Sequence, residues 1–372
     1  MRLVDLRTTP VSTPGTPTVT ARASDAAELL RLIGVIVDDE PDKYDVGASH
    51  IAELRAQVPE DLMVDIQAML PNERDDKSFL VLALLAASLP DPAGVEEFLA
   101  AMRAEPELPW RVLLAHNARE LDEPDTDGLR DRLLAGDPAA IGRLEALVAE
   151  GCCSEGTVTL MTMTPAEYGQ RLLDIVERFD QQVWRHNAEE AMGPIRRDAA
   201  HRNQQLADGA DVGAVVLEAT NGFELPDDPT IREIVLLPSY WFRPWLVVGN
   251  IGVDGLEVMS TAVADEFITL PSEVPPPALL KLFKALGDAG RLALLRRMTS
   301  GPISLGQAAT ELDVAKATAH HHLAILRQAG LVSLRGAGRS TKYGLREDPA
   351  GLAHDALARY VPQRPGRSTD RG

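Results

Sequence analysis

The chain has 372 residues, more than one ordinary small domain requires, and this length predicts two or three domains. Apolar residues make up 45% of the chain and charged residues 25%, which excludes wholesale disorder and allows a packed core. The formal net charge of −19, taken alone, argues against nucleic acid as a partner, but the charge is unevenly distributed along the chain.

The cysteine content and the N-terminus indicate the compartment. Cys152 and Cys153 are adjacent and can form neither a disulfide framework nor a four-ligand zinc site, so we expect a reducing cytoplasm. The N-terminus has no apolar segment typical of a secretory signal. The longest apolar run, 79–89, is too short for a membrane helix of about 20 residues. We interpret the two thiols as small apolar fillers; sensing of an oxidant or a soft metal is the alternative.

The first two hundred residues are predominantly helical in pattern. Residues 1–20 are rich in Thr and Pro and predict a loose lead-in with a short strand at its end. Ser24 is the expected N-cap of a helix that begins DAAELLRL. Helical patterns then continue to about residue 208, and the longest begins with Thr164 as cap and Pro165 at the first helical position. The pair Gly193-Pro194 is a candidate break in this segment.

Residues 213–270 have a different sequence pattern, in which runs of β-branched residues are separated by Gly and Asn. The runs GAVVLEAT, REIVLLPSYWF, PWLVVGN and LEVMSTA predict three or four strands of a small antiparallel sheet. We therefore expect an acidic helical-plus-sheet regulatory or effector domain over 21–270, followed by a proline-rich linker at 271–277. The predicted fold class is α+β, mostly helical.

The charge divides at this linker. Residues 276–372 contain 15 Lys and Arg against 7 Asp and Glu, a net of +8, which leaves −27 on the residues before them. A basic module attached to a strongly acidic one indicates that the basic module faces a polyanion such as nucleic acid.

The basic module begins with three helical patterns. In ALLKLFKALGD we expect one apolar face, formed by Leu279, Leu282, Phe283 and Leu286. Asp288 is the expected N-cap of AGRLALLRRM, and Ser304 is the expected N-cap of the third helix.

A fourth helix follows a short turn at Asp313, which we expect to cap it. The run VAKATAHHHLAILRQAG predicts an inward face of Ala319, His322, Leu323 and Leu326. The opposite face has no acid and carries Lys316, Ala317, His320, His321, Ala324, Arg327 and Gln328. Two small helices joined by a short turn, the second of them polar outward, predict a helix-turn-helix.

Two strands complete the module. LVSLR (331–335) and STKYGL (340–345) flank a Gly-rich basic tip and predict a β-hairpin. A helix-turn-helix followed by a hairpin is a winged helix, in which one helix enters the major groove and the wing reaches phosphates or the minor groove. A last helix closes the winged-helix domain, predicted over 278–361, and the basic tail 362–372 is expected to be disordered.

These segments resemble the arsenic-repressor (ArsR-type) family of bacterial winged-helix regulators. LFKALGDAGRLALLRRM, ISLGQAATELDVAKATAHHHLAILRQAGLV and GRSTKYGL occur in order over about residues 278–345. The resemblance implies that residues 316–321 meet the major groove and that helices at 278–287 and 350–361 form a homodimer. The candidate DNA contacts are Lys316, Thr318, His320, His321, Arg327, Arg335, Arg339 and Lys342.

Two features depart from the family. Ala315 and His320 stand where members commonly have Ser, which leaves open the operator that is read. No Cys stands near 311–313, where metal-sensing relatives have a thiol-rich site, and we expect no metal and no cofactor. Consecutive helical residues point about 100° apart, so the run His320–His322 cannot grip one ion, and we expect its first two members to contact DNA.

The large domain has one candidate ligand site. An aromatic cluster lies at 240–245 in a chain with only 4% aromatic residues, and a tryptophan of the long helical segment is expected to face it. One interpretation is the packing of helices onto the sheet. The other is a pocket for an apolar or anionic small molecule, formed by Trp184, Tyr240, Trp241, Arg243 and Trp245.

We therefore predict a cytoplasmic bacterial transcriptional regulator that is not an enzyme. It is expected to bind a palindromic double-stranded DNA operator as a homodimer, to be tuned by a ligand or partner at the N-terminal domain, and to have no membrane partner. Two alternatives remain open: a protein-interaction adaptor with secondary DNA binding, and an enzyme fused to a DNA-binding module.

Overall fold

The computed structural model describes residues 17–69, 78–89, 94–117, 128–149, 155–225, 228–249, 255–268, 275–335, 341–346 and 348–361. Several features named above lie outside these ranges. They are the lead-in up to residue 16, Cys152 and Cys153, residues 271–274 of the linker, the wing tip with Arg339, and the tail from residue 362.

The chain divides into two compact units. Unit 1 comprises Met1–Ala207 and Asp228–Val263, and unit 2 comprises Asp208–Asp227 and Ala264–Gly372. The chain therefore passes from unit 1 into unit 2 at residue 208, returns at 228, and leaves again at 264. The sequence places 208–227 in the large domain, whereas the structure groups this segment with the C-terminal module.

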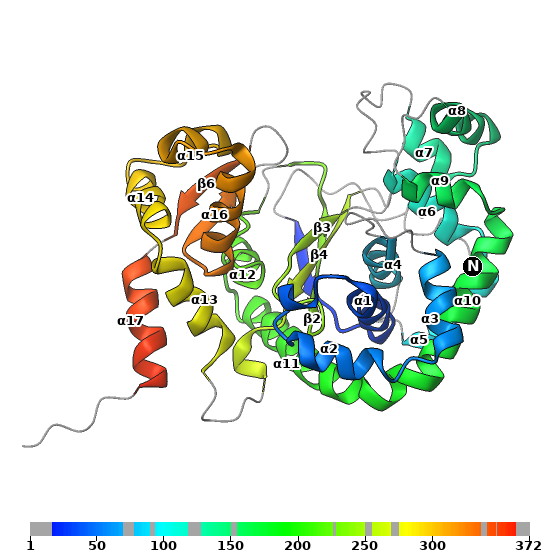
Figure 1. Ribbon diagram of the computed structural model, residues 1–372, viewed down its shortest axis with the longest axis horizontal. Coiled ribbons are helices and arrows are strands. Elements are labelled where there is room, and N and C mark those ends of the chain that lie inside the picture. The colour runs from blue at the N-terminus through cyan, green and yellow to red at the C-terminus, as the bar shows by residue number, and fades with distance from the viewer. Residues whose placement is uncertain are drawn as a thin grey trace, which may run out of the picture. The chain divides into compact units, whose positions relative to one another are not determined.

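Unit 1 consists of many helices around a small sheet (Figure 1). Its strands are β1 (Thr18–Ala21), β2 (Glu233–Ser239), β3 (Val247–Gly249) and β4 (Leu256–Ala262). Its helices are α1 (Asp25–Val37), α2 (Ala48–Arg55), α3 (Glu60–Met69), α4 (Ser78–Ala87), α5 (Val95–Ala104), α6 (Leu108–Asn117), α7 (Leu129–Leu134), α8 (Pro138–Ala149), α9 (Glu155–Met161), α10 (Pro165–Phe179) and α11 (Arg185–Ala207).

The sheet of unit 1 differs from the antiparallel sheet expected. Its strand order is β1-β2-β4-β3, and β1 and β4 both run parallel to β2; only β3 pairs antiparallel, with β4. The prediction was wrong because parallel pairing depends on long crossover connections, which short strand patterns do not reveal. Here helices α1 to α12 lie in the chain between the two partners β1 and β2.

Local capping signals in unit 1 are confirmed. The Ser24 hydroxyl accepts a hydrogen bond from the Ala27 backbone N–H at 3.2 Å, and Thr164 forms a capping box with Glu167. The helix does not break at Gly193-Pro194, since α11 runs through both residues. The irregularity lies earlier, in a π-helical turn at Asp180–Trp184 between α10 and α11.

Unit 2 contains α12 (Val212–Ala219), α13 (Pro277–Leu286), α14 (Ala289–Met298), α15 (Leu305–Leu312), α16 (Lys316–Gln328), β5 (Val332–Arg335), β6 (Lys342–Leu345) and α17 (Pro349–Tyr360) (Figure 1). The run GAVVLEAT was predicted as a strand, but it forms α12. Asp211 caps this helix by accepting a hydrogen bond from the Ala214 N–H at 2.8 Å, and this cap favours a helix over a strand.

The core of unit 2 is formed by the four helices α13, α14, α15 and α16 together with the hairpin β5–β6. Leu294, Leu323 and Leu331 are fully buried in it, and Ile303 extends the hairpin by pairing with Tyr343. The apolar face of α13 differs from the one expected, since Phe283 is 42% exposed. The fold class, α+β and mostly helical with a C-terminal winged helix, is confirmed.

Candidate nucleic-acid interface

The helix-turn-helix of unit 2 is formed by α15 and α16. Ser304 and Gln307 form a capping box at the start of α15. Asp313 does not cap α16 as expected. It ends α15 in a left-handed conformation with φ of 52°, and Ala315, which offers no side-chain cap, occupies the N-cap position of α16. The N-terminal N–H groups of α16 thus have no side-chain acceptor at the N-cap.

The inward face of α16 is the one predicted, and the N-terminal half of its outward face is exposed as expected, whereas Ala324, Arg327 and Gln328 are half-buried. Ala319, Leu323 and Leu326 are buried in the core of unit 2, and His322 is half-buried, with its Nδ1 3.7 Å from the Asp288 Oδ1. The other face exposes Lys316, Thr318, His320 and His321. This surface carries one ammonium group, one hydroxyl and two imidazoles within two turns, and it contains no carboxylate.

Arg327 stands apart from the other candidate contacts. It lies at the C-terminal end of α16, and burial lowers the pKa of its guanidinium, with the nearby Tyr343 ring acting in the opposite direction. Its side chain is half-buried and so offers less surface to a phosphate than Lys316 at the opposite end of the helix does.

The base of the wing carries two further candidates. In the antiparallel pair of β5 and β6, Arg335 lies directly opposite Lys342, and both side chains are exposed. Like charges at opposed positions of a sheet repel each other. The Arg335 guanidinium donates from Nε to the Glu224 carboxylate, which belongs to the segment after α12.

That segment is a part of the interface that the sequence pattern did not reveal. The Leu334 N–H donates to the Gly222 carbonyl at 2.6 Å, and the Glu224 N–H donates to the Leu334 carbonyl at 2.9 Å. Phe223 and Leu334 thus form a parallel bridge on the edge of β5 that faces away from β6. The dipeptide Asn221-Gly222 signals a turn, but nothing in its neighbourhood indicates a partner more than 100 residues away.

Asn221 joins the same segment to the end of α16. Its Nδ2 donates to the carbonyls of Gln328 at 2.9 Å and Arg327 at 3.3 Å, and its Oδ1 accepts from Arg346 at 3.2 Å. The last carbonyls of a helix have no partner within the helix, and Asn221 supplies one here. Its own φ of 51° is one that Asn tolerates better than most residues.

Asp288 connects α14 to α16. The Arg291 backbone N–H donates to its carboxylate at 2.9 Å, which makes it the N-cap that the sequence predicted. This hydrogen bond is the main cause of a lowered pKa for Asp288, with the charge of Arg291 and the proximity of His322 acting in the same direction.

The aromatic candidates of unit 1 are buried or half-buried, with Tyr240 and Trp245 among the half-buried ones. Trp241 is fully buried, makes an edge contact with Tyr240 at 4.9 Å between ring centroids, and stacks on His50 at 5.6 Å. Arg243 and Trp184 are also buried, and Trp245 is half-buried. The buried Glu28 carboxylate accepts from the backbone N–H groups of Tyr240 and Trp241 at 2.7 and 2.8 Å and so fixes the start of this segment.

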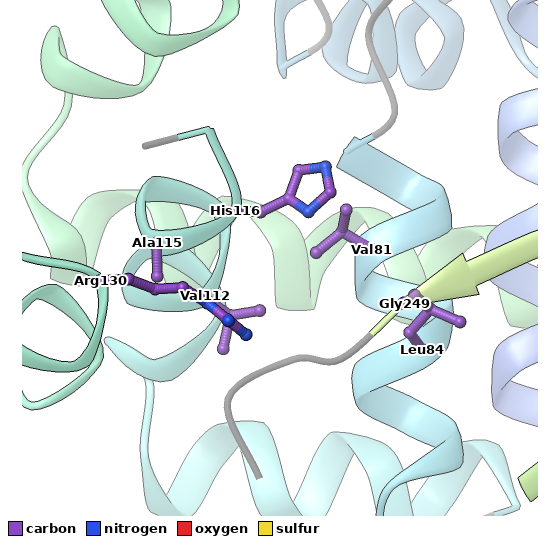
Figure 2. Close-up of a pocket in the computed structure, with 7 residues that line it drawn as sticks. All are labelled: Val81, Leu84, Val112, Ala115, His116, Arg130 and Gly249. Carbon is purple, nitrogen blue, oxygen red and sulfur yellow. The ribbon is translucent and has the colours of Figure 1, made fainter. Parts of the chain in front are cut away.

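A small pocket of unit 1 lies elsewhere. Figure 2 shows it between α4, α6, α7 and β3, with lining residues Val81, Leu84, Val112, Ala115, His116, Arg130 and Gly249. A Cβ at Gly249 would approach the Leu84 side chain to 2.8 Å, so the glycine allows β3 to lie close to α4. None of the aromatic candidates lines this pocket.

Over the part of the chain that the structure describes, no helix is both long and apolar enough to span a bilayer. Over the same residues, no three His, Cys, Asp or Glu side chains are grouped so that they could hold a metal ion.

Comparison with known proteins identifies the C-terminal unit. A family model described as a helix-turn-helix domain matches residues 286–335. The chain is 38% identical to the HTH-type transcriptional regulator Rv2034 of Mycobacterium tuberculosis over 73 residues, 20% of this chain and 66% of that protein. It is 34% identical to the biofilm growth-associated repressor of Agrobacterium fabrum over 92 residues, 23% of this chain and 79% of that protein.

A third relative supports the same family. The HTH-type transcriptional regulator CmtR of Mycobacterium bovis is 32% identical over 92 residues, 25% of this chain and 78% of that protein. All three matches cover a quarter of this chain or less. With the winged helix of unit 2 and the four exposed polar side chains of α16, these matches show that the chain belongs to the ArsR-type family of bacterial helix-turn-helix transcriptional regulators.

Proposed function

We propose that this regulator binds an operator as a homodimer, with one α16 in the major groove of each half-site. The observation that carries the proposal is the exposed, carboxylate-free face of α16, formed by Lys316, Thr318, His320 and His321. A helix of this kind fits the major groove, where cationic and hydrogen-bonding side chains read base edges. Arg339 and Lys342 of the wing add contacts to the phosphate backbone, Arg335 adds one when its ion pair with Glu224 opens, and Arg327 adds a weaker one.

The homodimer is proposed to form through α13 and α17, which pack together in unit 2. Both helices expose apolar side chains: Leu280 and Phe283 on α13, and Leu352 and Leu357 on α17, each at least 40% exposed. Apolar side chains that gather on two adjacent helices favour burial against a second copy. A two-fold axis through this surface would present two copies of α16 to a palindromic site.

Unit 1 is proposed to tune DNA binding in response to a small molecule or a protein partner in the cytoplasm. Residues 1–275, to which unit 1 belongs, carry a net charge of −27, which repels DNA and confines contact to the basic residues from 276 onward. No catalytic role is proposed for it.

The experiment is a salt-dependent titration of the full chain on the DNA upstream of its own gene and on a scrambled duplex. Tight binding to the first duplex only, with affinity that falls steeply with salt, supports the proposal. Equal and weak binding to both means that the operator lies elsewhere or that an effector is required. No binding to either duplex at low salt contradicts the proposal and favours an adaptor.

A further inference from the structure

Residues 220–224 belong to unit 2 but not to its winged helix, against which they pack. They approach from outside the winged helix, since the chain reaches them from α11 of unit 1 by way of α12 and leaves them toward β2 of unit 1. They form hydrogen bonds to α16 through Asn221 and to the base of the wing through Gly222 and Glu224.

The two ends of the segment contact different parts of unit 2. Asn221 caps the C-terminus of α16, and Glu224 lies at the base of the wing. Between them, Gly222 has a φ of 105°, and a Cβ there would lie 2.7 Å from the Val332 carbonyl oxygen. The contact is thus backbone against backbone, as in a strand added to a sheet edge.

Glu224 places a carboxylate where DNA phosphate is expected. Its Oε1 accepts from the Ser333 hydroxyl at 2.9 Å, and its Oε2 accepts from the Arg335 guanidinium. The Glu224 side chain is only 27% exposed and is fixed from two sides, whereas Arg335 is 72% exposed. The carboxylate also offsets the repulsion between Arg335 and the opposed Lys342.

We propose that Glu224 is an intrachain competitor of DNA: it holds the Arg335 guanidinium in an ion pair and so withholds it from the phosphate backbone. This inference rests on the proposed DNA binding. Since residues 208 and 227 connect directly to unit 1, a change in unit 1 that draws the segment away from β5 releases Arg335 and raises the affinity for DNA. The segment thereby gives unit 1 a route to the DNA-reading surface.

The test is a double-mutant cycle on the full chain with Glu224→Gln, Arg335→Gln and the double variant. Random-sequence duplex is the probe, because a phosphate contact needs no operator. One additional phosphate contact steepens the dependence of log K on log salt by about 0.9, which is about an eightfold gain in affinity at 0.1 M salt. We expect this gain in E224Q, little change in R335Q, and loss of the whole gain in the double variant.

Two further variants separate the ion pair from net charge and from misfolding. Glu311→Gln removes the same charge from α15 of unit 2, where its weak partner is Arg297, and any gain it gives should be unaffected by R335Q. Glu224→Asp keeps the charge but shortens its reach, and should give part of the gain. Urea unfolding of each variant establishes that it is folded.

The outcomes distinguish this inference from the function on which it rests. A gain in E224Q that persists without Arg335, or no gain at all, overturns the inference while leaving DNA binding intact. If neither the wild type nor E224Q binds any duplex at low salt, the proposed function and the inference both fail.

Discussion

Lys342 and His320 serve different tasks at the scale of single residues. Lys342 lies at the base of the wing and is proposed to meet the phosphate backbone, which is the same in every sequence. His320 lies on the exposed face of α16 and is proposed to meet base edges, which differ between sequences. Affinity and discrimination should therefore separate when the two are substituted.

Replacing Lys342 with Gln should weaken binding to operator and scrambled duplex alike and reduce the salt slope by about 0.9. Replacing His320 with Ala should instead change the ratio of the two affinities, by about fivefold or more. Titrations of both variants on both duplexes measure this. Equal losses on the two duplexes for His320→Ala would remove this residue from sequence reading.

Asp288 gives a prediction for stability. Asp288→Ala removes the N-cap of α14 and should lower the free energy of unfolding by about 1 kcal/mol at neutral pH. Its pKa is lowered in the folded protein, so the ionised carboxylate stabilises above its unfolded pKa of about 3.9, and this contribution is lost as the pH falls through the folded pKa. The difference between wild type and D288A should therefore shrink in acid.

Asp288→Asn is the matched control, because an amide oxygen still accepts from the Arg291 N–H but does not titrate. Urea midpoints of the three proteins at about pH 7 and about pH 3 give the comparison. If D288A differs from wild type by the same amount at both pH values, the charge of Asp288 contributes nothing to folding.

At the scale of elements, the added strand at residues 222–224 requires glycine at position 222. Gly209 and Gly222 both have positive φ, 86° and 105°, but a Cβ at Gly209 would meet no atom within 4 Å, whereas one at Gly222 would meet the Val332 carbonyl. The backbone conformation alone therefore penalises Gly209→Ala, and conformation and contact together penalise Gly222→Ala.

We expect Gly209→Ala to cost about 1 kcal/mol of unfolding free energy and Gly222→Ala roughly 2–4 kcal/mol. Hydrogen exchange of the Leu334 amide, which donates to the Gly222 carbonyl, reports the contact directly and should accelerate only in G222A. Equal protection of Leu334 in the two variants would mean that the added strand tolerates a side chain at position 222.

Elements that depend on neighbours in the chain could be predicted, and elements that depend on distant partners could not. Ser24, Thr164, Asp288 and Ser304 were predicted as caps because a cap bonds to a backbone group two or three residues away. The helix of GAVVLEAT was missed because β-branched residues favour strands, while the Asp211 cap and the surrounding packing favour a helix.

The candidate site shows the same division. The inward face of α16 followed from helical spacing, as the burial of Ala319, Leu323 and Leu326 confirms. The partner of Arg335 could not be foreseen, because Glu224 lies 111 residues earlier in the chain, in a segment whose pattern suggested another domain. The direction of β1 against β2 was beyond reach for the same reason.

For the whole molecule, the proposed homodimer gives the prediction. Phe283→Glu and Leu357→Glu place a carboxylate on the exposed apolar surface of α13 and α17, and each should shift the protein toward the monomer in sedimentation experiments. Val64→Glu, at an exposed apolar position of α3 in unit 1, is the control and should leave the mass unchanged. Operator affinity should fall in the variants that lose the dimer, since two linked half-sites bind more tightly than one.

If all three variants sediment as the wild type does, α13 and α17 do not hold two copies together. A monomeric wild type would leave a palindromic operator without a matching two-fold protein.

The chain order of the two units has a consequence for how such a regulator can be inherited. Codons 264–372 alone would carry a winged helix whose β5 edge is bare and whose α16 terminus lacks the Asn221 side chain. An open strand edge invites pairing with other chains. Recombination that transfers the complete DNA-reading unit must therefore also carry codons 208–227, together with the stretch of unit 1 encoded between them. The two functions are thus interleaved in the gene, and exchange of one without the other is disfavoured.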